Sequence, residues 1–178
     1  MFDNLATKVD KTIRNIPDFP KPGIIFKDIT PVLYDAVLFG ETIEFFKNEL
    51  LQITPEIDVV VGIESRGFIF GAPLALALQK SFVPVRKKGK LPYDVISVEY
   101  ALEYGHSVLE MHTDAIQSGQ KVAIIDDLLA TGGTMSAATS LIEQLGGEVV
   151  ANVVMVNLAF LGGQSKLGNT PLVSLLTY

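Results

Sequence analysis

The sequence predicts an α/β fold with a mainly parallel, twisted sheet that is flanked by helices. Three apolar runs rich in β-branched residues are predicted as strands: 58–63, 121–127 and 148–156. Runs that are apolar throughout, without alternation, are typical of parallel strands covered on both faces. Helical patterns at 68–79 and 136–145 follow the first two runs, and Gly146 and Gly147 mark the end of the second helix.

The chain before the first of these strands is predicted to form two helices separated by a proline-rich segment. Apolar residues recur at helical spacing over 2–16, and Asp35 is predicted to cap a second helix that runs to about Leu51. Several prolines and Gly23 interrupt regular structure between them. We therefore expect an ordered loop there, followed by a short apolar segment at 24–26.

The segment 87–105 is predicted to be an exposed antiparallel arm inserted between core elements. It opens with the basic sequence KKGKLP, and residues 95–100 then alternate in polarity. Long insertions of this kind are often lids or binding loops. His106 and His112, just beyond it, lack a metal-binding spacing such as H-E-x-x-H, so both are predicted to be structural.

Composition narrows the class of protein. With 178 residues the chain is expected to be one domain, 1–178, and its net charge of −6 argues against a general nucleic-acid or anionic-membrane surface. The most apolar stretch, 149–161, is shorter than the roughly 20 residues of a membrane-crossing helix. No cysteine is present, which excludes disulfides and thiolate chemistry and favours a cytoplasmic protein.

The strongest chemical motif is VAIIDDLLATGGT at 122–134. A buried strand ends in Asp126 and Asp127 and leads through a small-residue loop into a helix; the loop consists of Ala130, Thr131, Gly132, Gly133 and Thr134. Glycine backbone N–H groups, threonine hydroxyls and a helix N-terminus suit a phosphate, and the carboxylates suit ribose hydroxyls or a partly hydrated magnesium ion. A tight turn capped by Thr134 would explain the glycines but not the adjacent acids.

This motif resembles the 5-phosphoribosyl 1-diphosphate (PRPP) binding motif of type I phosphoribosyltransferases. Four other segments, in the expected order, make the chain similar to the adenine phosphoribosyltransferase family: PGIIFKDITPVL (22–33), VVGIESRGFIFGAPLA (60–75), PVRKKGKLP (84–92) and LEYGHSVLEMHTDAI (102–116). The resemblance implies the type I phosphoribosyltransferase fold, with an N-terminal hood at about 1–34 and a flexible lid at about 87–106.

The resemblance also assigns binding residues. It implies that Asp126, Asp127 and the 130–134 loop bind the 5′-phosphate and ribose of PRPP. The expected diphosphate residues are Glu64, Ser65, Arg66, Arg86, Lys87, Lys88 and Lys90. A guanidinium binds two phosphate oxygens at once, whereas a basic run taken alone is usually a solvated face.

The adenine site is expected at the hood. By resemblance, the purine stacks between Phe26 and Leu128, and backbone groups of Ile25 and Lys27 meet its edge. A backbone carbonyl accepts a hydrogen bond from a 6-amino group but not from a 6-oxo group, which favours adenine. Lys27 departs from the family's usual arginine. Without the resemblance, Phe26 would be taken for an ordinary core residue.

The lid supplies the last expected residues. Glu103 corresponds to the proton relay at the purine and Tyr104 to a lid residue that closes over the reactants. Closure excludes water that would hydrolyse PRPP.

The expected reaction forms AMP and diphosphate from adenine and PRPP. Magnesium is held mainly by PRPP, with help from Asp126 and Asp127. A homodimer is expected, with neither nucleic acid nor membrane as partner. Two alternatives stay open: the same chemistry on xanthine, hypoxanthine or guanine, or a PRPP-sensing regulator of the same fold, which would usually need an added nucleic-acid-binding segment.

Overall fold

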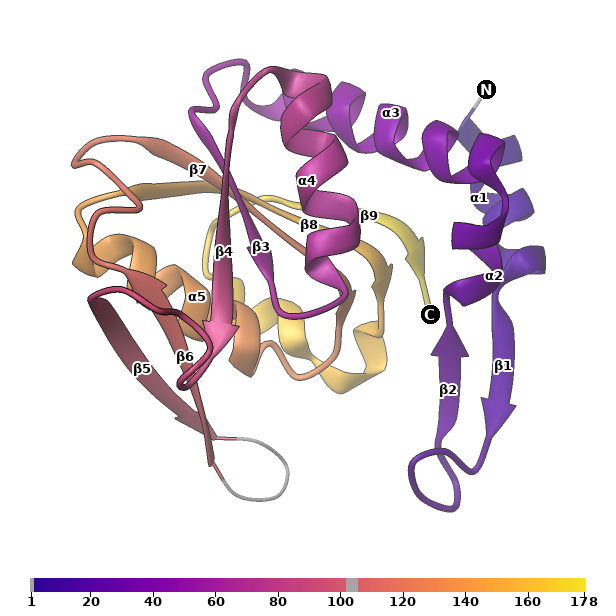
Figure 1. Cartoon of the computed structure of the whole chain (residues 1–178). Coiled ribbons are helices and arrows are strands. Elements are labelled where there is room, and N and C mark those ends of the chain that lie inside the picture. The colour runs from indigo at the N-terminus through magenta and orange to yellow at the C-terminus, as the bar shows by residue number, and fades with distance from the viewer. Residues whose placement is uncertain (1, 102–105) are drawn as a thin grey trace. The chain divides into compact units, whose positions relative to one another are not determined.

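A mainly parallel sheet is the centre of the fold in the computed structural model of the chain, which describes residues 2–101 and 106–178 (Figure 1). Within the described residues this sheet has seven strands in the order β5-β6-β4-β3-β7-β8-β9. Their bounds are β3 Val59–Ile63, β4 Ser81–Lys87, β5 Val95–Ala101, β6 His106–His112, β7 Lys121–Leu129, β8 Glu148–Asn157 and β9 Leu172–Thr177. The run from β4 to β9 is parallel, which confirms the predicted fold class.

The three predicted strands are confirmed as β3, β7 and β8, but β4 and β9 were not predicted. All five residues of β3 are buried because the sheet is covered on both faces. Pro84 obscured β4, since proline cannot donate to a strand ladder. The pairing of β4 with β6 begins only at Arg86, so Pro84 is paired with β3 alone.

Helices α4 (Gly67–Leu78) and α5 (Gly133–Gln144) cover opposite faces of β3. Val59, Val61 and Ile63 belong to the buried cluster that contains the α5 residues. On the other face α4 lies so close that a Cβ on Gly71 would be 3.5 Å from the Cα of Gly62. The alternation along β3 therefore places one helix on each side of the sheet.

For α4 and α5, three of the four helix ends agree with the prediction to within one residue. Helix α5 begins three residues before the predicted Ser136, because the helix starts inside the glycine-rich loop. Its predicted end is confirmed: Gly146 has φ +83°, and Gly147 N–H donates to the Ile142 carbonyl. This is a Schellman ending, which requires a residue with positive φ.

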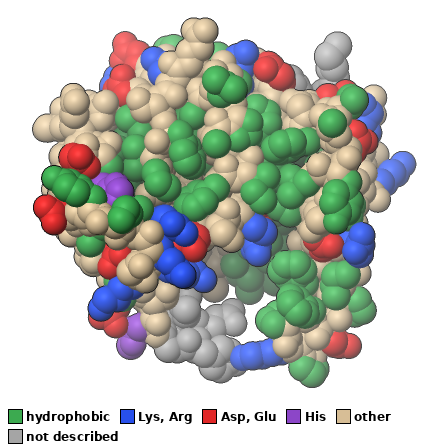
Figure 2. All heavy atoms as spheres, in the orientation of Figure 1, with side chains coloured by type: hydrophobic (Ala, Val, Ile, Leu, Met, Phe, Trp, Pro, Cys, Tyr) green, Lys and Arg blue, Asp and Glu red, His purple; other side chains and the backbone are tan. Residues whose placement is uncertain are grey.

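The outer face of α4 is apolar as well as the inner face. Leu76 is 80% exposed and Ile69 is 39% exposed. Figure 2 shows hydrophobic side chains gathered over this helix. None of the helices in the described part of the chain combines the length and apolar character of a bilayer crossing.

The antiparallel arm consists of β5 and β6, paired from Val95 with His112 to Ala101 with His106. The predicted alternation is confirmed: Ile96, Val98 and Tyr100 pack against the core, while the residues between them are exposed. The prediction of an exposed arm over 87–105 is confirmed for one face of β5 only, because the other face covers the core. The second strand of the arm, β6, lies beyond the predicted range and also pairs with β4. Lid movement stays a prediction.

The chain divides into two compact units, Met1–Phe45 and Phe46–Tyr178, and the sheet belongs to the second. The first contains α1 (Phe2–Thr12), β1 (Arg14–Pro17), β2 (Ile25–Asp28), α2 (Thr30–Tyr34) and the start of α3 (Ala36–Ile53). The helix predicted over 2–16 ends at Thr12 instead, because Ile16 lies in β1 and pairs with Phe26 of β2. The predicted cap is confirmed, since Asp35 Oδ1 accepts from the Val37 and Leu38 amides at 3.0 Å each.

Candidate active site

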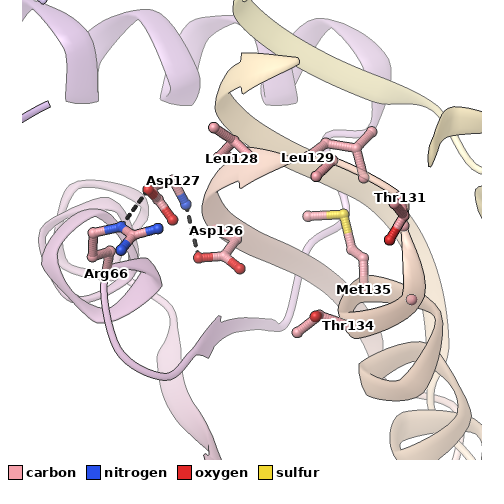
Figure 3. Close-up of a pocket in the computed structure, with 11 residues that line it drawn as sticks. Arg66, Asp126, Asp127, Leu128, Leu129, Thr131, Thr134 and Met135 are labelled. Carbon is pink, nitrogen blue, oxygen red and sulfur yellow. Dashed lines mark hydrogen bonds and ion pairs between the residues drawn. The ribbon is translucent and has the colours of Figure 1, made fainter. Parts of the chain in front are cut away.

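A cavity of about 210 Å³ lies where β7 ends and α5 begins (Figure 3). Its lining contains all seven residues predicted for the 5′-phosphate and ribose, and also Arg66. The full lining is Arg66, Asp126, Asp127, Leu128, Leu129, Ala130, Thr131, Gly132, Gly133, Thr134 and Met135. Ligands of open α/β sheets bind at the carboxyl ends of the strands, and this cavity occupies that position.

The loop between β7 and α5 presents backbone donors to the cavity. Gly132 precedes the helix with φ +76°, a conformation that glycine adopts without strain. Its carbonyl accepts from Ser136 N–H at 3.0 Å, which begins the helix. The N–H groups of the first helical turn have no partner inside the helix, and the helix dipole favours an anion there. The arrangement can therefore bind a phosphate group.

A second segment supports this loop from behind. A Cβ on Gly163, in the short helix η2 (Gly163–Leu167), would collide with the Ala130 carbonyl oxygen and lie 2.8 Å from Gly132 N. A Cβ on Gly132 would in turn collide with the Gly163 carbonyl oxygen. The two backbones approach so closely that only glycine fits at both positions. Sequence reasoning missed Gly163, because the contact joins segments that are distant in the chain.

The two carboxylates at the end of β7 have different surroundings. Asp127 is 5% exposed, and its Oδ2 lies 2.5 Å from Arg66 Nε in an ion pair (Figure 3). Asp126 Oδ1 accepts the Asp127 amide at 2.8 Å. Burial raises the pKa of Asp126 well above its usual range, and the charge of Asp127 raises it further. The pair therefore offers one carboxylate matched by a cation and one that holds a proton more readily.

An adjoining cavity of about 300 Å³ shares Arg66, Asp126, Asp127 and Thr134 with the first. Its other lining residues are Glu64, Ser65, Lys87, Tyr100 and Ser107. The predicted phosphate loop and part of the predicted diphosphate set thus line neighbouring cavities. Tyr100 and Ser107 pair in register across the arm. Sequence reasoning missed them because alternation predicts which face of a strand a residue lies on, but not which cavity that face lines.

Glu64 joins two of the predicted diphosphate segments. Its Oε2 accepts from the Lys87 amide at 2.9 Å and lies 3.3 Å from Arg86 Nε. Partial burial raises the pKa of Glu64, but these two hydrogen bonds together with the charges of Arg86 and Lys90 outweigh it, and the net pKa is lowered. The peptide bond between Glu64 and Ser65 is cis. The carboxylate therefore tethers the end of β4 to the loop before α4.

The remaining basic residues lie on the turn after β4. Arg86 Nη1 donates to the Lys90 carbonyl at 3.1 Å, and the side chains of Lys88 and Lys90 are exposed. Arg86, Lys88 and Lys90 are not among the described residues that line either cavity. Their predicted contact with diphosphate stays a prediction.

The predicted adenine residues fall in two units. Ile25, Phe26 and Lys27 form part of β2 in the first unit, where Ile25 is 60% exposed and the ring of Phe26 packs edge-on against Phe19 at 5.2 Å. Leu128 lines the first cavity in the second unit. An adenine site formed by both sets stays a prediction.

The predicted lid residues Glu103 and Tyr104 lie outside the described residues. His106 is exposed, 3.8 Å from Glu99, and the ring of His112 packs edge-on against Tyr93 at 6.0 Å. Among the described residues, no three His, Cys, Asp or Glu side chains gather as a metal-binding group. Asp126 and Asp127 supply the carboxylate oxygens among the residues that line the first cavity.

Comparison with known proteins agrees with this geometry. The family model for the phosphoribosyl transferase domain matches residues 38–166. The adenine phosphoribosyltransferase of Acetivibrio thermocellus is 57% identical over 166 residues, which are 93% of this chain and 96% of the relative. The relative from Kosmotoga olearia, of the same name, is 54% identical over 93% of this chain and 96% of its own.

Solved structures agree as well. The adenine phosphoribosyltransferase of Thermoanaerobacter pseudethanolicus has a TM-score of 0.93 at 50% identity, covering 97% of this chain and 99% of its own. The Saccharomyces cerevisiae enzyme, solved with adenine and an imino-altritol bisphosphate, has a TM-score of 0.93 at 43% identity over the same shares. The chain therefore belongs to the phosphoribosyltransferase family, among the adenine phosphoribosyltransferases.

Proposed function

We propose that the chain is a pentosyltransferase of purine salvage that forms AMP and diphosphate from adenine and PRPP. One observation carries the proposal: the phosphate loop, the Arg66–Asp127 ion pair and Asp126, whose pKa is raised by burial, line one cavity. The relatives that share this chain's sequence over 93% or more of its length are named for the same reaction.

The phosphate loop is proposed to hold the 5′-phosphate of PRPP. The backbone N–H groups of 131–134 and the hydroxyls of Thr131 and Thr134 are the donors, and the N-terminus of α5 supplies a favourable dipole. Because Gly163 supports the loop from behind, these donors keep their positions when the anion arrives. A preorganised site loses less conformational freedom on binding.

Asp126 and Asp127 are proposed to bind the ribose hydroxyls. As diphosphate leaves, positive charge develops on the sugar, and the transition state resembles an oxocarbenium ion. A carboxylate close to the ring stabilises that charge more in the transition state than in the ground state. Adenine N9 forms the new bond to the anomeric carbon as the bond to diphosphate breaks.

The diphosphate is proposed to lie between the loop 64–66 and the basic turn that contains Arg86, Lys87, Lys88 and Lys90. Negative charge accumulates on the leaving group, and cations fixed nearby lower the barrier. Lys87 already lines the same cavity as Arg66. Ser65 contributes a hydroxyl to that lining.

The purine is proposed to stack on Phe26 and Leu128, with backbone groups of Ile25 and Lys27 at its edge. The exposed surface of Ile25 on β2 leaves room for a ligand at this strand. Phe26→Ala is expected to raise the KM for adenine about tenfold and leave the KM for PRPP near its original value. Phe19→Ala, which removes the neighbouring ring, is the matched control, and equal effects from both variants would contradict the stacking role.

Glu103 is proposed to relay the proton at the purine, and Tyr104 to cover the reactants. Glu103→Gln is then expected to lower kcat more than it changes either KM. Unchanged turnover in steady-state assays would remove Glu103 from the mechanism.

Magnesium is proposed to arrive with PRPP. The two carboxylates at the cavity are the hard oxygen donors that Mg²⁺ prefers, and an ion that keeps several waters needs only one or two of them. Asp126 and Asp127 would hold the ion where it borders the ribose. When bound, it neutralises part of the diphosphate charge.

Two copies of the chain are proposed to associate in the cytoplasm, each working as one catalytic domain over 1–178. The apolar outer face of α4 supports association, because extended apolar surface on a soluble protein usually marks an interface. Sedimentation of wild type and Leu76→Glu tests this: the variant is expected to be smaller. Equal masses for the two proteins would remove α4 from the interface.

The decisive experiment measures diphosphate release from PRPP and magnesium with adenine, hypoxanthine, guanine, xanthine or no base. Release with adenine alone is expected. Release with a 6-oxopurine instead would keep the chemistry and overturn the adenine site at 25–27. No diphosphate release with any base, while PRPP still binds, would favour a PRPP sensor.

A further inference from the structure

Glu110 is a buried carboxylate that the proposed reaction does not use. It lies in β6, is 5% exposed, and stands in register between Arg86 of β4 and Ser97 of β5. Its Oε2 accepts from the Gly89 amide at 2.8 Å, while its Oε1 is 3.5 Å from Ser97 Oγ. Its close hydrogen bond therefore goes to the basic turn after β4.

That turn, 87–90, has a partner for each of its backbone N–H groups, and two of the four partners are carboxylates from other elements. Lys87 N–H donates to Glu64 at 2.9 Å, and Gly89 N–H donates to Glu110 at 2.8 Å. The other two donate to backbone carbonyls: Lys88 to Val108 and Lys90 to Lys87, each at 3.2 Å. The turn is thus fixed from two sides by negative groups.

The geometry of the turn explains why the hydrogen bond to Glu110 matters at its tip. Gly89 has φ +76° at the third position, as a type II turn requires, and a Cβ there would meet nothing within 4 Å. Packing around Gly89 therefore does not restrain the tip, which is held by hydrogen bonds: two to backbone carbonyls and two to the carboxylates of Glu64 and Glu110. A buried carboxylate is costly unless it is well paired, so a hydrogen bond to the Gly89 amide satisfies both groups.

We propose that Glu110 is a positioning residue that fixes the turn 87–90, so that its lysines meet the diphosphate end of PRPP. The inference rests on the proposed function, because it assumes that diphosphate binds at this turn. Glu110 itself touches no reactant. It acts through the Gly89 amide, while Glu64 holds the other end of the turn.

The test compares Glu110→Leu, which replaces the acceptor with an apolar side chain of similar size, with Glu110→Gln, which keeps one acceptor oxygen. Glu110→Leu is expected to raise the KM for PRPP and the inhibition constant of diphosphate about tenfold, as for one lost hydrogen bond to a charged group. Glu110→Gln is expected to restore most of the difference. The KM for adenine should change less than about twofold in both.

Ser97→Ala is the matched control, because it removes the other neighbour of the same carboxylate without touching the turn. It is expected to leave all constants near wild type. Hydrogen exchange at 87–90 adds a local readout: the Gly89 amide should exchange faster in Glu110→Leu than in Ser97→Ala.

A lower melting temperature with unchanged PRPP and diphosphate constants would overturn the proposal and leave Glu110 a stabilising residue only. If the wild-type chain proves inactive with every base, the proposed function fails. Calorimetric titration of the full chain with magnesium diphosphate then decides the positioning role: weaker binding in Glu110→Leu supports it, and equal binding overturns it.

Discussion

The two ends of the proposed PRPP site are built in contrasting ways. The phosphate loop at 130–134 uses backbone and small side chains, and it is supported by backbone contact with Gly163. The basic turn at 87–90 uses long exposed side chains on a backbone held by Glu64 and Glu110. The first end is fixed by close packing, since a Cβ added at Gly132 or Gly163 would collide with the facing backbone. The second end is fixed by hydrogen bonds, so a substitution there is expected to weaken diphosphate binding by degrees and not to abolish it.

The largest expected effect comes from adding one carbon to the packed end. Gly163→Ala should lower kcat/KM for PRPP about 100-fold, because a displacement near 1 Å in a positioning loop has effects of this size. Steady-state kinetics measures it. Gly40→Ala is the control, since a Cβ there meets nothing within 4 Å. Wild-type kinetics in Gly163→Ala would show that the phosphate loop adapts as readily as the basic turn.

Asp127→Asn should have the next largest effect, about 30-fold on kcat/KM for PRPP. The substitution keeps the shape of the side chain but removes the charge that pairs with Arg66 and that is proposed to bind the ribose. Arg66 then remains beside a neutral group. A change confined to the KM for adenine would place Asp127 away from the sugar.

The stability of the site should depend on Asp126 in a defined direction. Its folded-state pKa lies above the ordinary value, so the folded protein binds the extra proton, and this contribution is present below the ordinary pKa. It is lost as the pH rises through the raised pKa. Asp126→Asn should therefore melt a few degrees above wild type at pH 7.5, with the difference shrinking toward pH 4.

Thermal melts of both proteins across that pH range measure the effect. A difference that does not change with pH would mean that Asp126 titrates alike in the folded and unfolded chains. Activity should fall in the variant above the raised pKa, where Asp126 of the wild type is charged and the substitution removes that charge from the proposed ribose contact.

The smallest effects belong to single lysines of the basic turn. Lys88→Gln should weaken diphosphate inhibition about threefold, since exposed charges contribute little individually. Added salt should reduce the difference between variant and wild type, because screening acts on exposed charges first. An effect as large as that of Gly163→Ala would contradict the graded character of this end.

The features predicted best from the sequence are those formed by one continuous stretch of the chain. The central strands β3, β7 and β8 are uninterrupted apolar runs, and the phosphate loop follows β7 directly, so one stretch of sequence contains both. β1 was mistaken for helix because Ile16 keeps helical spacing, and only its pairing with Phe26 makes it a strand. That pairing is not visible in local periodicity.

The sequence could not predict which residues support the phosphate loop and the basic turn. Gly163 contacts the phosphate loop, Glu110 holds the basic turn, and Tyr100 with Ser107 lines the shared cavity. Each comes from a segment well separated from the motif it serves. Glycine pairs and glutamates are too common for composition to single them out, so these contacts required the folded structure.

The close contact of Gly163 with Ala130 and Gly132 also orders events during synthesis. The ribosome makes β7 and the phosphate loop before α5, β8 and η2. The loop therefore leaves the exit tunnel without the backbone that holds it in shape. The proposed 5′-phosphate site therefore gains its supporting backbone only when η2 has been made, after α5 and β8 and shortly before β9, the last strand of the sheet.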